Sequence, residues 1–188
     1  RFPMPDLIHR STIKGLIKVL DSGFDSFAYE QELFESNQYG FEIFPGGKGD
    51  VRGKTVFASD AVGLLIRWTV IDDQFLEKMP SLCAIVRYGV GYENIDLNAA
   101  TRHRVRIANV QGYGNDAVSD HALALMYSCN RFLPDGQNRI RELFGAPPDK
   151  YIREFHECTL GIIGLGRIGG ALCRKARRLF KEVVACDP

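Results

Sequence analysis

Short apolar runs alternate with segments of helical periodicity along the first hundred or so residues. Runs of about four to eight apolar residues are typical of buried strands, whereas apolar residues that recur every three or four positions are typical of helices. The pattern predicts strands at 16–20, 41–44, 62–68, 83–87 and 105–108. It predicts helices at 24–36, 72–79 and 97–104. Strands that alternate with helices over short connections indicate an α/β fold with a parallel sheet.

Two details of this pattern concern burial and helix ends. The run at 62–68 is apolar at nearly every position, which predicts a strand covered on both faces. Asp72 and Asp96 each precede a helical segment. An aspartate at this place can accept a hydrogen bond from the first free backbone N–H groups of the helix. We therefore expect both residues to be N-caps.

The longest predicted helix covers residues 117–131. The turn Gly112-Tyr113-Gly114-Asn115 precedes it and indicates a hinge. After it, the stretch 132–155 contains several prolines and glycines and is predicted to be loosely structured. We place a domain change at this turn, with a first domain at 1–112 and a second at 113–188. The expected apolar face of the helix consists of Val118, His121, Ala122, Leu125, Met126 and Cys129.

Composition and charge exclude several classes of protein. Of the 188 residues, 45% are hydrophobic, and 24 basic residues nearly balance 23 acidic ones, so neither disorder nor nucleic-acid binding is indicated. The apolar runs are far shorter than the roughly 20 residues of a membrane span. Five scattered cysteines, mostly in apolar runs, predict buried reduced thiols and a cytoplasmic protein. Because the chain begins at Arg1, we expect it to be a piece of a longer protein.

The strongest chemical signal is a strand, glycine turn, helix and second strand near the end of the chain. An apolar run at 159–163 predicts a buried strand, and Gly164, Gly166 and Gly169 follow it. In a dinucleotide-binding unit the first glycine permits a tight turn, the second admits a pyrophosphate, and the third lets helix and strand pack closely. Asp187 ends the second strand, 18 residues after the last glycine, where an acid binds ribose hydroxyls.

This motif predicts a cofactor as well as a fold. The helix begins with Arg167 and Ile168 in its first turn, and its free N–H groups would face the phosphates. Asp187 would repel a 2′-phosphate, which favours NAD over NADP. We therefore predict that Gly164, Gly166, Arg167, Ile168, Gly169 and Asp187 bind NAD. The alternative is a glycine-rich turn without a ligand.

Three segments together resemble the D-isomer-specific 2-hydroxyacid dehydrogenase family: residues 86–96, residues 109–123, and residues 160–169 with Asp187. The middle segment looks most like the branch that includes the C-terminal-binding corepressors and their bacterial relatives. Two positions depart from the usual pattern, since many members have Glu at Asp120 and Asp is usual at Glu93. Both differences keep the charge. The resemblance implies a flavodoxin-like substrate domain followed by the start of a Rossmann NAD-binding domain.

The resemblance also implies a substrate site. The backbone of Gly89-Val90-Gly91 is expected to face the substrate carboxylate, because small residues with free N–H groups suit an anion. Arg67 and Arg87 each close an apolar strand, where an unused charge is costly. We predict substrate binding for Arg67 and favour a structural role for Arg87, with an ion pair as the alternative explanation of both. A plain strand-to-helix turn is the alternative for the glycines.

We name no catalytic residue in this chain, because the family's catalytic arginine, acid and histidine are expected beyond Pro188. The first functional hypothesis is an NAD-dependent dehydrogenase of D-2-hydroxy acids, of which these residues alone are expected to be inactive. The second is an NAD-sensing corepressor-like scaffold of the same fold with little turnover. A formate dehydrogenase is a third, weaker option. We predict no metal, nucleic acid or membrane partner, and a homodimer formed through Leu133, Ile140, Leu143 and Phe144.

Overall fold

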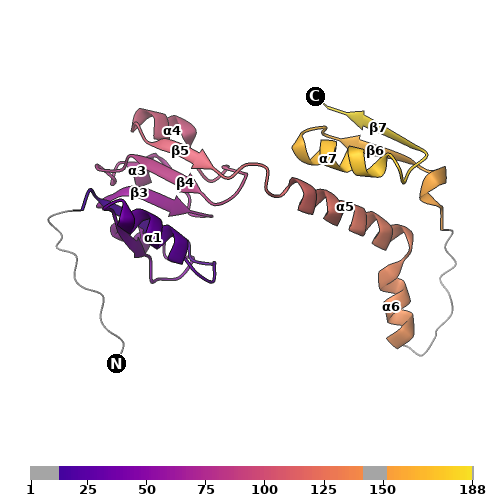
Figure 1. Ribbon diagram of the computed structural model, residues 1–188, viewed down its shortest axis with the longest axis horizontal. Helices are drawn as coiled ribbons and strands as arrows, with labels where there is room; N and C mark the ends of the chain where they lie inside the picture. The colour runs from indigo at the N-terminus through magenta and orange to yellow at the C-terminus, as the bar shows by residue number, and fades with distance from the viewer. Residues whose placement is uncertain (1–12, 142–151, 188) are drawn as a thin grey trace. The chain divides into compact units, whose positions relative to one another are not determined.

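The computed structural model describes residues 13–141 and 152–187. The chain divides into two compact units, and the division falls between Gln111 and Gly112. Each unit contains its own parallel sheet, and we describe each by itself (Figure 1).

The first unit is a five-stranded parallel sheet with helices between its strands. The strands lie in the order β2-β1-β3-β4-β5, which is the flavodoxin-like order predicted from the resemblance. All five predicted strands are present, with their ends shifted by one or two residues. The strands are β1 (Leu16–Val19), β2 (Gly40–Ile43), β3 (Ala61–Ile66), β4 (Ala84–Arg87) and β5 (Arg106–Asn109). The helices are α1 (Ala28–Ser36), α2 (Val51–Ala58), α3 (Asp73–Leu76) and α4 (Leu97–Arg102).

Two hydrophobic clusters cover the two faces of this sheet. The larger joins Leu64 and Ile66 of β3 to α2, α3 and α4. The smaller joins Leu65 of the same strand to Phe27, which precedes α1, and to Phe34 of α1. Successive side chains of a strand point to opposite faces, so β3 contributes to both clusters. The prediction of a strand covered on both faces is confirmed.

The helix ends follow the predicted caps, although one helix has no counterpart in the expected pattern. Asp72 accepts the Phe75 N–H at 2.8 Å, and Asp96 accepts the Ala99 N–H at 2.9 Å. The unpredicted helix is α2, which contains Gly53 and has no strong apolar periodicity. Its first turn is held by the Asp50 carboxylate, which accepts the Gly53 N–H at 2.8 Å.

The second unit contains helices and a two-stranded parallel sheet. Its strands are β6 (Thr159–Ile163) and β7 (Glu182–Cys186), connected through α7 (Arg167–Ala176). Before them lie α5 (Asn115–Asn130), α6 (Leu133–Arg141) and a short 3₁₀ helix, η2 (Phe155–Glu157). The helix α6 occupies part of the stretch that was predicted to be loosely structured, so that prediction is wrong for residues 133–141.

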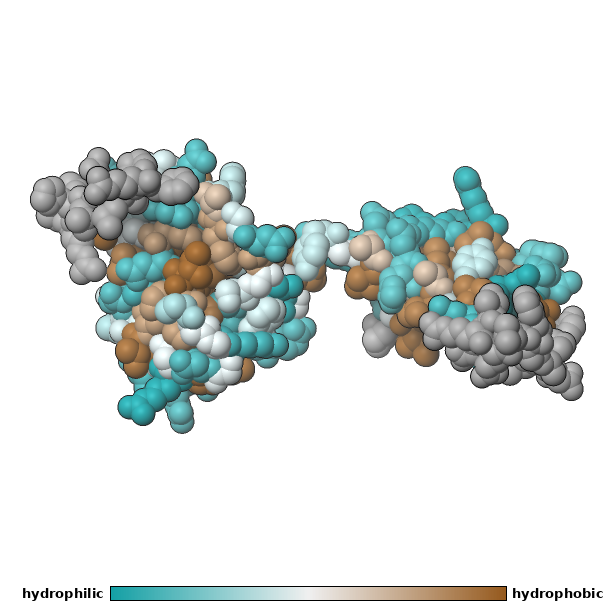
Figure 2. All heavy atoms as spheres, turned by 90° about the horizontal axis from the view of Figure 1, so that it is seen from below, coloured by the Kyte–Doolittle hydropathy of each residue, from teal (hydrophilic) through white to brown (hydrophobic). Residues whose placement is uncertain are grey.

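Burial in the second unit differs from the prediction. In β6, only Ile162 is buried, while the Ile163 side chain is 94% exposed. The prediction of a buried strand is therefore wrong, because a sheet of two strands among the described residues offers little surface for covering both faces. Apolar side chains remain visible at the surface of this unit (Figure 2).

The face of α5 that packs inside the unit also differs from the predicted one. Ser119 is fully buried and accepts a hydrogen bond from Lys175 Nζ of α7 at 2.8 Å. The same ammonium lies 2.6 Å from Asp120 and 3.2 Å from Asp116, and hydrogen bonding to Asp120 raises the pKa of Lys175. Polar contacts therefore select the packed face. Most of the predicted apolar face is exposed, namely Val118, His121, Leu125 and Cys129.

The cysteines are free but not buried. Cys83, Cys129 and Cys186 are exposed, and Cys158 and Cys173 are partly exposed. The prediction of unpaired thiols is confirmed, whereas the prediction that they are buried is wrong. The apolar runs that contain them lie at strand ends and on a helix face that the described residues leave uncovered.

Candidate functional site

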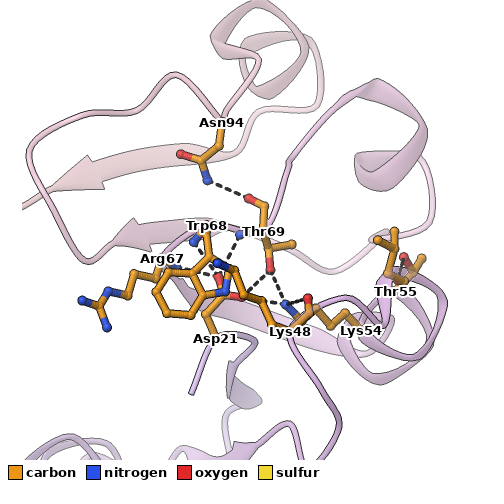
Figure 3. Close-up of polar contacts among 9 residues, drawn as sticks. Asp21, Lys48, Lys54, Thr55, Arg67, Trp68, Thr69 and Asn94 are labelled. Carbon is orange, nitrogen blue, oxygen red and sulfur yellow. Dashed lines mark hydrogen bonds and ion pairs between the residues drawn. The ribbon is translucent and has the colours of Figure 1, made fainter. Parts of the chain in front are cut away.

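The carboxyl ends of the parallel strands in the first unit meet at one edge, where α/β sheets bind ligands. Asp21 follows β1 at this edge and is 2% exposed. Its Oδ2 atom accepts the backbone N–H groups of Arg67, Trp68 and Thr69 at 2.7, 2.9 and 2.9 Å (Figure 3). One carboxylate oxygen therefore shapes the backbone turn that leaves β3.

The other oxygen of Asp21 belongs to a buried ion pair. Lys54 Nζ from α2 lies 2.7 Å from Oδ1, and the Thr69 hydroxyl donates to the same atom at 2.7 Å. Burial by itself would raise the pKa of Asp21. The hydrogen bonds from Lys54, Arg67 and Thr69 outweigh this effect and lower the pKa from 3.8 to about 2. The carboxylate is thus ionised at neutral pH and rigidly held. The sequence analysis did not single out this residue, although an acid directly after an apolar run was a visible signal.

Arg67 lies at this edge without an acidic partner. Its guanidinium stacks over Phe24 at 4.9 Å and over Trp68 at 4.7 Å, and it donates to the Gly23 carbonyl at 3.3 Å. Among residues 13–141 and 152–187, neither Arg67 nor Arg87 forms an ion pair with a carboxylate. The alternative explanation of these arginines, a structural ion pair, therefore finds no support in the described residues.

The Gly89-Val90-Gly91 turn follows β4, the strand next to β3. Gly89 has a φ of +149°, a conformation that residues with a side chain rarely adopt, so this position favours glycine. The carbonyls of the turn are used, since Gly89 accepts the Val110 N–H at 3.1 Å and Val90 accepts the Asn109 amide at 2.6 Å. The N–H groups of Val90 and Gly91 find no acceptor within the described part of the chain.

These two features lie on neighbouring strands. Ile66 pairs with Arg87 across β3 and β4, and the Tyr88 N–H donates to the Ile66 carbonyl at 2.8 Å. Arg67 and the glycine turn thus begin at the same level of the same sheet edge. This edge of the sheet therefore carries a guanidinium and two N–H groups, and both kinds of donor suit an anion.

In the glycine turn of the second unit, the backbone and the packing each require one glycine, at Gly164 and Gly169 respectively. Gly164 has a φ of +90°, and its N–H donates to the Cys186 carbonyl at 2.8 Å. A side chain at Gly169 would overlap the Gly164 carbonyl oxygen, so close packing of helix on strand requires this glycine. By contrast, no atom lies within 4 Å of a side chain built at Gly166, the N-cap of α7. Its surroundings are open.

The acid at the end of β7 is tied to the same turn. Asp187 Oδ1 accepts the Leu165 N–H at 2.8 Å, and the Asp187 side chain is exposed. Arg167 and Ile168 form the first turn of α7 beside it, and Ile168 is 43% exposed. All six residues predicted to bind the cofactor therefore lie in or next to one turn.

Two further kinds of site are absent from the described residues. The described residues contain no cluster of three or more His, Cys, Asp or Glu side chains that could hold a metal ion. Within the same residues, no helix is both long enough and apolar enough to cross a membrane.

The fold and these turns define a class of protein: two α/β units, of which one has a flavodoxin-like strand order and the other a strand–glycine turn–helix–strand motif of the dinucleotide-binding type. The family follows from comparison with known sequences. The model of the D-isomer specific 2-hydroxyacid dehydrogenase catalytic domain matches residues 23–185, and the chain belongs to this family.

Relatives and solved structures agree with this assignment. The D-3-phosphoglycerate dehydrogenase of Archaeoglobus fulgidus is 32% identical over 120 residues, which are 64% of this chain and 23% of that protein. Glyoxylate/hydroxypyruvate reductase B of Shigella flexneri is 35% identical over 129 residues, 67% of this chain and 40% of that protein. A D-lactate dehydrogenase of Aquifex aeolicus, solved with NAD and lactic acid, shares the fold. Its TM-score is 0.75 at 18% identity, covering 91% of this chain and 55% of that one.

The chain thus spans less than half the length of these two relatives.

Proposed function

We propose that this chain is part of an NAD-dependent oxidoreductase that interconverts a D-2-hydroxy acid and the corresponding 2-oxo acid. The observation that carries the proposal is the Gly89-Val90-Gly91 turn, whose Val90 and Gly91 N–H groups have no acceptor in the described residues. A substrate carboxylate would accept both, and Arg67 on the adjacent strand would supply the opposite charge. The names of the relatives, all 2-hydroxy or 2-oxo acid enzymes, support the same class of substrate.

We propose NAD as the cofactor. The open space at Gly166 and the N-terminus of α7 suit a pyrophosphate, and Asp187 suits the hydroxyls of a ribose. The negative charge of Asp187 would oppose the 2′-phosphate of NADP. NAD is also present in the D-lactate dehydrogenase that shares the fold.

In this proposal the chain binds and orients both ligands. The bound nicotinamide supplies hydride transfer to or from the second carbon of the acid. The turn at Gly89–Gly91 holds the carboxylate, which fixes the position of that carbon, and Asp21 keeps the backbone beside Arg67 in one conformation. We assign the proton transfer to no residue of this chain.

Two measurements on the longer protein test the proposal against the scaffold alternative. Oxidation of NADH with glyoxylate, pyruvate or hydroxypyruvate is the expected result for an enzyme. NAD-dependent association with negligible turnover would instead favour a corepressor-like scaffold. The chain of 188 residues alone is expected to bind NAD without turnover, and steady NADH oxidation by it would contradict our placement of the catalytic residues.

We also propose that the longer protein is a homodimer. The face of α5 that includes Val118 and Leu125 is exposed, as is Leu133 at the start of α6. The side chain of Ile140, together with Leu143 and Phe144, lies outside the described residues. A two-fold interface would bury such a face against its own copy. The family resemblance supports pairing through this region.

A further inference from the structure

Two carbonyl groups of the Gly89-Val90-Gly91 turn are held from the end of β5. The Gly89 carbonyl accepts the backbone N–H of Val110 at 3.1 Å, and the Val90 carbonyl accepts the side-chain amide of Asn109 at 2.6 Å. Asn109 is the last residue of β5, the strand that pairs with β4. Successive carbonyls of a regular strand point to opposite neighbours, whereas these two have their donors on the same side.

The direction of these carbonyls determines where the N–H groups of the turn point. In a trans peptide unit the C=O and the N–H point in opposite directions. The described residues contain no cis peptide bond. The Gly89 carbonyl shares its peptide unit with the Val90 N–H, and the Val90 carbonyl shares its unit with the Gly91 N–H. Both N–H groups therefore point away from the end of β5.

This common direction gives the two N–H groups one open side. β4 lies between β3 and β5, so the side away from β5 is the side of β3. Neither the Val90 nor the Gly91 N–H has an acceptor within residues 13–141 and 152–187. Neighbouring N–H groups that point the same way form a concave donor site for an anion. The donors at the end of β5 thus produce the arrangement that the proposed carboxylate site needs.

The two donors hold the turn in different ways. Val110 acts through its backbone, whereas Asn109 acts through its side chain. The peptide unit between Val90 and Gly91 ends at a glycine, which resists rotation less than any other residue. The amide of Asn109 is therefore the group that fixes this unit. Its own orientation is set by Gln111, whose side-chain amide donates to Asn109 Oδ1 at 3.3 Å and leaves Nδ2 to Val90.

We propose that Asn109 is a positioning residue of the substrate site. Its amide holds the Val90–Gly91 peptide unit so that the Gly91 N–H faces the carboxylate of the 2-oxo or 2-hydroxy acid. This inference rests on the proposed function. Asn109 acts through the backbone and donates nothing to the acid itself. Because Val110 sets the Val90 N–H independently, loss of the Asn109 amide should affect one N–H group of the turn and spare the other.

Affinity alone does not measure this orientation, because a negative charge lies beside the turn. The Glu93 carboxylate lies against Gly91, where a Cβ would contact it. Its charge lowers the affinity for any acid, whichever way the N–H groups point. The test therefore needs a separate signal from each N–H group.

The amide signals of Val90 and Gly91 in a proton–nitrogen NMR spectrum supply this readout. The 188-residue chain is titrated with pyruvate, and we expect both signals to move saturably. Asn109→Leu keeps nearly the same shape without a donor. In this variant pyruvate should bind about tenfold more weakly, and at saturation the Gly91 signal should move less than half as far while the Val90 signal still moves. A Gly91 response equal to that of the wild-type chain would overturn the proposal.

Two further variants show whether the effect is local. Asn37→Leu is the matched control, because Asn37 also donates its amide to a carbonyl, that of Leu33, at 2.7 Å, but at the end of α1, before β2. It should leave both signals and the pyruvate affinity unchanged. Asn109→Ala removes the same amide without a larger side chain and should repeat the result of Asn109→Leu. Equal losses in Asn37→Leu and Asn109→Leu would overturn the proposal.

The titration of the wild-type chain separates the two levels of inference. If neither the Val90 nor the Gly91 signal responds to pyruvate, the carboxylate does not bind at this turn and the proposed function fails. If both respond in the wild-type chain and respond equally in Asn109→Leu, the positioning inference fails and the proposed function stands.

Discussion

At the scale of single residues, Asp21 holds a buried network of hydrogen bonds that the sequence pattern did not reveal. It accepts three backbone N–H groups, one hydroxyl and the Lys54 ammonium, all while buried. Such a carboxylate cannot be replaced without leaving its partners unpaired in an apolar setting. The backbone of Arg67, which lies at the proposed substrate site, depends on it.

Asp21→Asn is expected to destabilise the first unit by about 3 kcal/mol, because it leaves the Lys54 ammonium buried without a counter-charge. Urea unfolding followed by Trp68 fluorescence measures the change. Asp25→Asn, an exposed aspartate in the same connection, is the control and should change the free energy of unfolding by less than about 0.5 kcal/mol. A loss as small in Asp21→Asn as in the control would contradict the importance of the buried pair.

The same residue makes stability depend on pH. Its pKa is lowered from 3.8 to about 2 on folding, so the unfolded chain binds a proton more readily than the folded one. The stabilisation from Asp21 is therefore complete above about pH 4 and is lost as the pH falls towards 2. We expect the difference in unfolding free energy between the wild-type chain and Asp21→Asn to shrink over this range. A constant difference between pH 5 and pH 2 would contradict it.

The choice of cofactor is a third question at this scale. Asp187→Asn keeps an oxygen that can accept the Leu165 N–H but removes the charge, so the turn should keep its shape. We expect NAD to bind more tightly than NADP to the unmodified chain, and the preference to narrow in this variant. Calorimetry with both dinucleotides measures it. Tighter binding of NADP by the unmodified chain would show that Asp187 does not select the cofactor.

At the scale of elements, the two glycines at either end of the first turn of α7 have different roles. A Cβ at Gly166 meets no described atom within 4 Å, so with Gly166→Val the unit should remain folded while NAD binding falls at least tenfold, because the added side chain occupies the path of the pyrophosphate. Gly169→Ala overlaps the Gly164 carbonyl and should instead destabilise the packing of α7 on β6.

Circular dichroism and NAD calorimetry on both variants distinguish these effects. Unchanged NAD affinity in Gly166→Val would contradict the binding role of this turn. Unchanged thermal stability in Gly169→Ala would contradict the role of Gly169 in packing.

The strands of the first unit were predictable because each includes a short apolar run, whereas their order was predicted from the family resemblance. The helix α2 was missed because the contacts of Lys54 and the Asp50 cap stabilise it rather than apolar periodicity. The packed face of α5 was missed for a similar reason. Ser119 is buried where it accepts a hydrogen bond from Lys175, while Leu125 is exposed. Local pattern does not reveal which polar groups meet across 30 or 50 residues.

In the candidate sites too, local features could be predicted from the sequence and contacts between distant residues could not. Glycine turns such as Gly164 and Gly89 could be located because their backbone requirements act within a few residues. The Asp21–Lys54 pair and the stacking of Lys48 on Trp68 join separate connections of the sheet. Only the parallel order of the strands brings those connections to one edge.

At the scale of the whole molecule, the assembly of the longer protein can be tested on the exposed helix face. Leu125→Lys should convert a homodimer to a monomer without loss of stability, because Leu125 is 52% exposed in the single chain. Tyr29→Lys on α1, at a site 76% exposed, is the control and should leave the dimer intact. Light scattering at micromolar concentration measures both. A monomer in the unmodified longer protein would contradict the proposed dimer.

The contacts of Lys175 between α5 and α7 also determine where a chimera of this protein and a relative can be joined. Lys175 contacts Asp116, Ser119 and Asp120, so the two helices pack as one unit although 55 residues separate Lys175 from Asp120. A chimera joined between Gln111 and Gly112 exchanges this pair of helices whole. A chimera joined in the connection between α5 and β6 takes α5 from one parent and α7 from the other. The buried Ser119 then faces a side chain of the other parent. Exchange of cofactor units among relatives is therefore favoured at the first junction and penalised at the second.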